Sequence, residues 1–370
     1  MSQPPDEPMD APLDAPPDAS LAAPLDDQAA TAPTAVAATL EAAPGGSAHR
    51  CGYVAIVGRP NVGKSTLLNR LLGQKLAITS HKPQTTRHTI LGVSTLAGGQ
   101  ILYVDTPGLH QRGGNALNRY LNRAARALLT DVDLVLLVVE ALQFTDEDAL
   151  ALAEIAKAGT PTLVAVNKSD RVADKTRLLP FLRALSERHA FVSLVPVSAL
   201  KGHQVEALEA EILAALPAGE PLFPPDQLTD RSERFLAAEL LREQLMQRYG
   251  QELPYRTTVE IESFTLEPSG EARPKAEQPK AGPKTGRSTG TERAEEPRAR
   301  IQALIWVERE SQKAIIIGHR GEALKAAASQ ARLEMQKLFG RRVHLEVWVK
   351  VKDSWSSDEA ALASLGYGEY

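Results

Sequence analysis

The residues Gly58-Arg59-Pro60-Asn61-Val62-Gly63-Lys64-Ser65 decide how this chain begins to fold. The apolar run 53–57 before them is typical of a buried strand, and residues 66–72 after them have a helical pattern. A glycine-rich loop between a strand and a helix directs backbone N–H groups and the helix N-terminus towards phosphates. A glycine turn that contains Lys-Ser by chance would not account for the flanking strand and helix. The stretch predicts a nucleoside triphosphate site.

The polar residues of this loop have distinct predicted roles. Lys64 is expected to reach the β- and γ-phosphates and to act in catalysis, and the Ser65 hydroxyl is expected to bind Mg²⁺. The nucleotide contacts predicted from the loop are Gly58, Arg59, Pro60, Asn61, Val62, Gly63, Lys64, Ser65 and Thr66.

The motif Asn167-Lys168-Ser169-Asp170 follows the apolar run 164–166 and indicates the base. The Asp170 carboxylate can accept hydrogen bonds from the N1–H and N2–H₂ groups of guanine, which adenine does not offer. Asn167 is expected to brace the phosphate loop, and the Lys168 stem to lie against the purine. Alone, the motif is a common polar turn. After a phosphate loop it predicts a guanine pocket and disfavours ATPases and small-molecule kinases.

The pair Ser198-Ala199 follows another apolar run, 195–197. Backbone N–H groups of this turn are expected to meet the guanine O6. Ser198 and Ala199 therefore complete the predicted base pocket.

The stretch Asp105-Thr106-Pro107-Gly108-Leu109 follows a predicted strand at 101–104. Asp105 is expected to hold Mg²⁺ through water, and the Gly108 N–H to sense the γ-phosphate and take part in catalysis. All five residues are predicted to contact the nucleotide.

A threonine upstream is expected to complete the metal site. Thr86 is favoured as a metal ligand and catalytic residue, and Thr85 is the alternative. An ordinary entry into an edge strand is the other interpretation of this threonine pair, and the neighbouring motifs disfavour it.

Leu109 stands where Ras-like enzymes place a glutamine that orients the attacking water. Leucine cannot polarise water, so backbone groups, ordered water, a partner or a monovalent cation must do so. Asn61 is the candidate ligand for such a cation, K⁺. We therefore expect slow intrinsic hydrolysis of GTP to GDP and phosphate.

With these motifs and the stretch 343–352, the chain resembles the Era family of GTPases over roughly residues 52–365. The resemblance implies an α/β Ras-like P-loop GTPase domain, with a mostly parallel sheet and helices on both faces, followed by a smaller α+β type II KH domain. It also implies binding of 16S ribosomal RNA near its 3′ end and a role in assembly and maturation of the 30S ribosomal subunit.

The second domain is also visible in the residue pattern. Residues 231–241 have helical spacing with Asp230 as a candidate N-cap, and 258–262 alternate like a half-buried strand. A strand at 301–307 and a long helix at 323–338 follow. The predicted order is helix, strand, strand, helix, loop, helix, strand.

The loop before that long helix is the candidate RNA contact. Its Gly-Xaa-Xaa-Gly pattern can clamp a single-stranded backbone, because glycines let phosphates approach closely. A helix cap and turn is the simpler interpretation of such a pattern. The predicted RNA-binding residues are Ile317, Gly318, His319, Arg320 and Gly321.

Charged residues are distributed unevenly along the chain. Residues 301–352 contain ten Lys or Arg and five Asp or Glu, a net of +5, whereas residues 1–49 contain eight acids and no Lys or Arg. A basic segment in an acidic chain favours a phosphate backbone as partner, although a solvated helix face is the alternative.

The same composition bounds the domain organisation and the compartment. The chain has no secretory signal, no apolar run of about 20 residues and no cysteine besides Cys51, so it is expected to be cytoplasmic. It is also expected to be a monomer. The expected segments are a disordered acidic tail (1–50), the GTPase domain (51–216), a Pro-rich linker (217–229), the KH domain (230–355) with a disordered insertion (267–300), and a C-terminal tail (356–370).

Two functions remain open from the sequence. The first is a GTP-hydrolysing switch protein for assembly of the small ribosomal subunit. The second is a nucleotide-gated RNA-binding adaptor, peripheral on the inner face of the cell membrane, in which hydrolysis is incidental.

Overall fold

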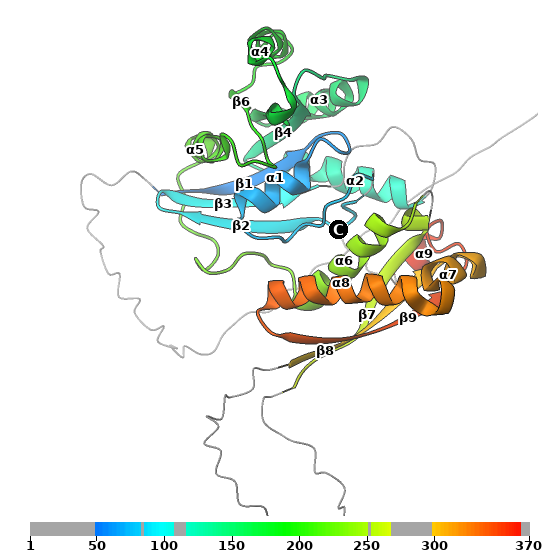
Figure 1. The fold of residues 1–370 in the computed structure, drawn as a ribbon. Coiled ribbons are helices and arrows are strands. Elements are labelled where there is room, and N and C mark those ends of the chain that lie inside the picture. The colour runs from blue at the N-terminus through cyan, green and yellow to red at the C-terminus, as the bar shows by residue number, and fades with distance from the viewer. Residues whose placement is uncertain (1–48, 83–84, 107–115, 251–252, 268–297, 364–370) are drawn as a thin grey trace, which may run out of the picture. The chain divides into compact units, whose positions relative to one another are not determined.

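A computed structural model describes residues 49–82, 85–106, 116–250, 253–267 and 298–363 (Figure 1). The structural statements below concern these residues. Two sheets organise them, one of six strands and one of three.

The six-stranded sheet has the order β2-β3-β1-β4-β5-β6. Its strands are β1 (Arg50–Val57), β2 (Ile90–Leu96), β3 (Gly99–Asp105), β4 (Leu134–Glu140), β5 (Thr162–Asn167) and β6 (Ser193–Pro196). Every neighbouring pair is parallel except β2 and β3, which are antiparallel. The carboxyl ends of β1, β3, β4 and β5 therefore meet at one edge, which is where ligands bind in open α/β sheets.

Helices cover both faces of this sheet (Figure 1). They are α1 (Lys64–Leu71), α2 (Ala116–Thr130), α3 (Asp146–Ala158), α4 (Leu178–Ser186) and α5 (Val205–Ala215). Apolar side chains of α1 and α5 pack on one face, and those of α2, α3 and α4 pack on the other. Because both faces are buried, strands such as β4 are almost continuously apolar.

The three-stranded sheet has the order β7-β8-β9, with β7 antiparallel and β9 parallel to the central β8. The elements of this region are α6 (Glu233–Arg248), β7 (Thr257–Glu267), β8 (Arg298–Val307), α7 (Glu310–Ile317), α8 (Glu322–Phe339), β9 (Arg342–Val351) and α9 (Glu359–Leu362). Apolar residues of α6 and α8 pack on one face of the sheet. The predicted order of elements is confirmed.

One predicted cap is wrong. The N-cap of α6 is Ser232, whose side chain accepts a hydrogen bond from the Phe235 N–H, and not Asp230. The helix begins at Glu233, so Asp230 lies too far before its first turn to cap it.

The segment 217–229 runs along the first sheet. The Gln100 side chain accepts from the N–H groups of Leu222 and Phe223, and the Val93 N–H donates to Leu228. Its backbone is thus tied to the sheet at several points.

Three predictions lie partly or wholly outside the described residues. They are the disordered tail 1–50, the insertion 267–300 and the C-terminal tail 356–370. Disorder is wrong at the described ends of the first two, since Arg50 begins β1, Glu267 ends β7 and Arg298 begins β8. Among the residues that the structure describes, no helix combines the length and the apolar character needed to cross a bilayer.

Candidate functional site

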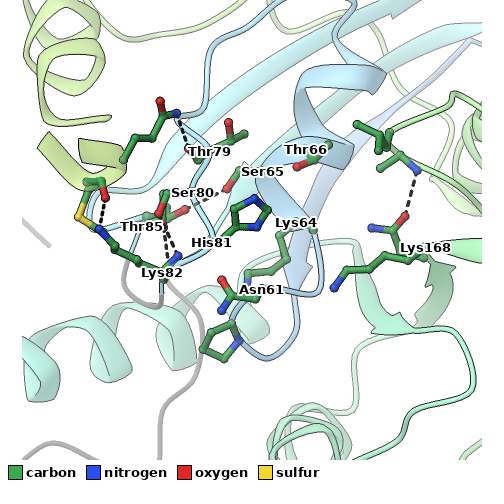
Figure 2. Close-up of a pocket in the computed structure, with 18 of the residues that line it drawn as sticks. Asn61, Lys64, Ser65, Thr66, Thr79, Ser80, His81, Lys82, Thr85 and Lys168 are labelled. Carbon is green, nitrogen blue, oxygen red and sulfur yellow. Dashed lines mark hydrogen bonds between the residues drawn. The ribbon is translucent and has the colours of Figure 1, made fainter. Parts of the chain in front are cut away.

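A cavity of about 650 Å³ lies at the carboxyl edge of the first sheet. Four groups of residues line it: the phosphate loop, the loop that follows β5, Ala199 and Leu200 after β6, and residues 79–82, 85 and 86, joined by Met246 and Gln247 from α6. Figure 2 shows residues 79–82 on one side of Lys64 and Lys168 on the other. The cavity is large enough for a nucleoside triphosphate.

The phosphate loop has the backbone shape that its glycines allow. Gly63 has φ +103°, and a Cβ there would lie 2.4 Å from the Asn167 side-chain nitrogen. Lys64 Nζ donates to the carbonyls of Gly58 at 2.9 Å and Arg59 at 3.0 Å. Burial lowers the pKa of Lys64 to about 8. The lysine is therefore held at the mouth of the loop, where phosphate oxygens would bind.

Three oxygens converge beside this loop. Asp105 Oδ2 accepts from Ser65 Oγ at 3.2 Å and from Thr86 Oγ1 at 3.1 Å, and the two hydroxyls lie 3.2 Å apart. Asp105 Oδ1 is buried with no hydrogen-bond partner, and burial raises the pKa of this carboxyl to about 6. Hydroxyl and carboxylate oxygens are ligands that Mg²⁺ prefers, so the orphaned oxygen fits a cation site.

The structure distinguishes the two candidate threonines. Thr86 is buried and bonded to Asp105, whereas the Thr85 hydroxyl donates to the Lys82 carbonyl at 2.6 Å. Thr86 is therefore the threonine that lies with Ser65 and Asp105 at the candidate cation site.

The base side of the cavity is held by side-chain bridges. Asn167 Nδ2 donates to the Val62 carbonyl at 2.8 Å, as its predicted bracing role requires. Ser198 Oγ donates to Asp170 Oδ1 at 2.6 Å, and this hydrogen bond contributes most to lowering the pKa of Asp170. The Ala199 N–H donates to Asn167 Oδ1 at 3.0 Å, so it positions the asparagine. A hydrogen bond from the Ala199 N–H to the guanine O6 stays a prediction.

Arg59 takes a different course from the rest of the loop. Its guanidinium donates to Glu140 at 3.2 Å and to Asp148 at 3.1 Å, and Lys168 Nζ donates to the same Glu140 at 2.7 Å. Neither Arg59 nor Val62 lines the cavity.

Lys75, Thr79 and Lys82 are bonded to α6 and to the residue that follows it. Glu243, fully buried, accepts from the Thr79 N–H at 2.9 Å and from Lys75 Nζ at 2.6 Å. Lys82 Nζ donates to the carbonyls of Met246 and Tyr249 at the end of the helix.

Arg87 completes this attachment. Its side chain, 1% exposed, donates to the carbonyls of Pro254, Tyr255 and Thr257 at 2.8–3.0 Å. No local pattern around Arg87 predicts these partners, which lie more than 160 positions away along the chain. Arg87, the residue next to Thr86, is thus bonded to the segment that leads into β7.

Three predicted site residues, Pro107, Gly108 and Leu109, lie outside the described residues. The remaining residues of that stretch are placed: Asp105 ends β3, and Thr106 Oγ1 donates to the Ile56 carbonyl at 2.8 Å.

The Gly-Xaa-Xaa-Gly loop joins α7 to α8 as predicted. Gly318 has φ +70° and ψ −177°, and Arg320 and Gly321 also have positive φ. His319 and Arg320 are exposed, and the neighbouring Ile315 is a large apolar side chain that is 57% exposed. An exposed apolar residue beside a basic turn is a second feature suited to unstacked bases.

The fold and the site together define a class. A phosphate loop after β1, an aspartate after β3, and an Asn-Lys-Ser-Asp turn after β5 form a Ras-like GTPase domain, and a KH domain follows it. Comparison with protein families agrees: residues 53–168 match the family described as 50S ribosome-binding GTPase, and residues 288–356 match the KH domain.

Individual relatives narrow the class. The chain is 51% identical over 323 residues to GTPase Era of Pseudomonas savastanoi pv. phaseolicola, covering 87% of this chain and 98% of the relative. It is 52% identical over 318 residues to GTPase Era of Azotobacter vinelandii, covering 86% and 97%. The chain belongs to the GTPase Era family and is a GTPase.

Solved structures give the same assignment. A variant of Aquifex aeolicus Era bound to GDP·AlF₄⁻ matches with a TM-score of 0.76 and 36% identity over 86% of this chain and 100% of that one. Era in complex with MgGDPNP and nucleotides 1506–1542 of 16S ribosomal RNA also matches at 0.76 and 36%, over 87% and 100%.

Proposed function

We propose that this GTPase binds the 3′-terminal region of 16S ribosomal RNA through its KH domain and assists assembly of the 30S subunit. The observation that carries the proposal is the match, over the whole length of that chain, to an Era bound to nucleotides 1506–1542 of 16S ribosomal RNA. The exposed His319-Arg320 turn of this chain supplies the matching chemistry, since cationic and polar groups between two glycines suit a phosphate backbone.

In this proposal the nucleotide lies in the cavity between Lys64 and Lys168 (Figure 2). Lys64 contacts the phosphates, Asp170 accepts from the guanine edge, and Asn167 keeps the loops together. The residues that would hold Mg²⁺ are Ser65, Thr86 and, through water, Asp105. When bound, the ion neutralises charge that develops on the phosphate oxygens.

Water positioning is assigned to the loop and not to residue 109. Asn61 lines the cavity and is exposed, so its side chain is available as a K⁺ ligand. Bound K⁺ would supply positive charge at the bond that breaks.

The proposed domain limits are those predicted from the sequence, with the GTPase domain at 51–216 and the KH domain at 230–355. Composition supports a cytoplasmic monomer. Peripheral contact with the membrane is the weaker alternative, with the basic KH surface as its motivation.

A multiple-turnover GTPase assay with and without a 3′-terminal 16S oligonucleotide tests the proposal. We expect the RNA to stimulate turnover and Arg320→Asp to abolish the stimulation, because a carboxylate repels the RNA backbone. Arg183→Asp is the matched control: its side chain is 83% exposed on α4, and it should leave the stimulation unchanged.

The same assay separates the alternatives. RNA that binds without changing turnover favours the adaptor, in which hydrolysis is incidental. Absence of RNA binding by the intact protein contradicts both. A parallel titration of the wild-type protein with GTP and ATP tests the guanine pocket by itself.

A further inference from the structure

Glu140 joins the two halves of the nucleotide site without lining the cavity. It is the last residue of β4, and it lies opposite Asn167 in the parallel register of β4 and β5. Its Oε2 accepts from Lys168 Nζ at 2.7 Å and from Arg59 Nη2 at 3.2 Å. One carboxylate oxygen thus holds a cation from the base side and a cation from the phosphate side.

The second partner of Arg59 makes this link rigid. Arg59 Nε donates to Asp148 Oδ2 at 3.1 Å, and Asp148 is fully buried in the first turn of α3. Asp148 also accepts from the N–H and hydroxyl of Thr145, so its position is fixed by the helix cap. Arg59 is therefore held between β4 and α3, and this fixes the loop backbone at residue 59.

The burial of the cluster argues against an ordinary surface ion pair. The Arg59, Glu140 and Lys168 side chains are only 14%, 15% and 20% exposed. Burial works to raise the pKa of Glu140, but the hydrogen bond from Lys168 and the surrounding positive charges outweigh it, so the pKa lies below its ordinary value. The carboxylate is charged at neutral pH, as its ion pairs with Lys168, Arg59 and Arg171 require.

We propose that Glu140 is a positioning residue for guanine nucleotide binding. By holding Lys168 Nζ it orders a flexible stem before the purine arrives, which lowers the entropy lost on binding. By holding Arg59 it fixes the carbonyls of Gly58 and Arg59, to which Lys64 donates. The inference rests on the proposed contact of Lys168 with the base.

The test is Glu140→Gln in the full chain, which keeps the shape and removes the charge. The dissociation constants of GDP and GTP should each rise about tenfold, while kcat at saturating GTP stays within about twofold. The preference for GTP over ITP should not change, because Asp170 reads the exocyclic amine. Glu154→Gln is the control: Glu154 is an α3 carboxylate paired with Arg126 and Lys157 outside the site.

A double-substitution cycle shows whether the effect passes through the lysine. In a Lys168→Met background, which keeps the apolar stem, Glu140→Gln should weaken binding by no more than about threefold. Unchanged affinity of the single variant overturns the proposal. The proposal is also overturned if kcat falls as much as the affinity, or if the nucleotide-free protein loses an equivalent amount of thermal stability. These outcomes leave the guanine pocket intact if the wild-type protein still prefers GTP to ATP.

Discussion

The two sides of the nucleotide cavity are held in different ways. On the base side, Asn167, Asp170 and Lys168 are bonded to Val62, Ser198 and Glu140, all of which belong to the first sheet and its loops. The proposed metal side comprises Ser65, Thr86 and Asp105. There the residues around Thr86 are bonded to α6 and to the start of β7.

We infer from this difference that the base side serves recognition of the guanine and that the metal side serves the response to the nucleotide state. The base side is held by residues of the first sheet and its loops alone, as the proposed guanine contact requires. On the metal side, Thr79, Lys82 and Thr85 are bonded to α6, so we expect any change in these residues on nucleotide binding to alter contacts with α6. A buried, bonded attachment such as Arg87 transmits such a change because packed contacts do not deform continuously.

The largest effect is expected on the base side, from Asp170→Asn. The substitution removes the charge from both hydrogen bonds and places an NH₂ donor against one of the two guanine donors, at about 1.5–3 kcal/mol for each contact, so GTP should bind roughly 1,000-fold more weakly. Titration calorimetry with GTP measures this. RNA binding in the absence of nucleotide should be unaffected, and a parallel loss there would break the proposed separation of the two sides.

Next in size is Arg87→Met, which acts on the metal side. Three carbonyls lose their common donor, and the free energy of unfolding should fall by about 3 kcal/mol in denaturant titrations. Arg183→Met, on an exposed side chain, should cost less than about 0.5 kcal/mol. Equal effects of the two substitutions would mean that the Arg87 contacts do not hold the domains together.

Exchange of K⁺ for Na⁺ sharpens the account of catalysis. Turnover should fall about tenfold in Na⁺, since the smaller ion fits a K⁺ site poorly and positive charge at the phosphates is lost. An Asn61→Ala variant should be slow in both salts. Equal wild-type rates in K⁺ and Na⁺ would remove Asn61 from the mechanism.

The smallest effect is a pH dependence at His88, between the two domains. Burial lowers its pKa to about 4, with Arg242, Arg87 and Arg231 adding to the shift and Glu239 opposing it. The unfolded chain therefore binds more protons between about pH 4 and 6.5, and stability falls as the pH drops through that window. From about pH 7 to about pH 5.5 the loss is about 1 kcal/mol.

A His88→Gln variant isolates this term. Its stability should lack that part of the pH dependence, whereas His203→Gln, at an exposed position, should retain it. If His88→Gln and wild type lose stability in parallel on acidification, the histidine is not held neutral.

Local patterns in the sequence predicted where most of the candidate site residues lie in the fold. The strand ends that carry Asp105 and Asn167, the glycine loop and the order of the KH elements are all signalled by short-range spacing. Such spacing places side chains at one sheet edge, because parallel strands end together. Ser65, which follows β1, meets Asp105 for the same reason. Thr86 reaches this edge because it precedes β2, which is antiparallel to β3.

The metal side's outer wall could not be predicted in this way. Met246 and Gln247 read only as part of an amphipathic helix, and Arg87 only as a basic residue in a polar stretch. Their partners depend on how two sheets pack, which no local periodicity encodes. The Ser232 cap was missed for a smaller reason, since Asp230 and Ser232 are both good capping residues and only the helix start distinguishes them.

The most direct test of the central claim is the affinity of the full-length protein for a 3′-terminal 16S oligonucleotide, measured at one salt concentration with GDP and with a non-hydrolysable GTP analogue. Because residues around Thr86 line the proposed nucleotide cavity and are also bonded to α6 and to the start of β7, the two dissociation constants should differ by roughly fivefold or more. Affinities that agree within experimental error in both nucleotide states would contradict the account.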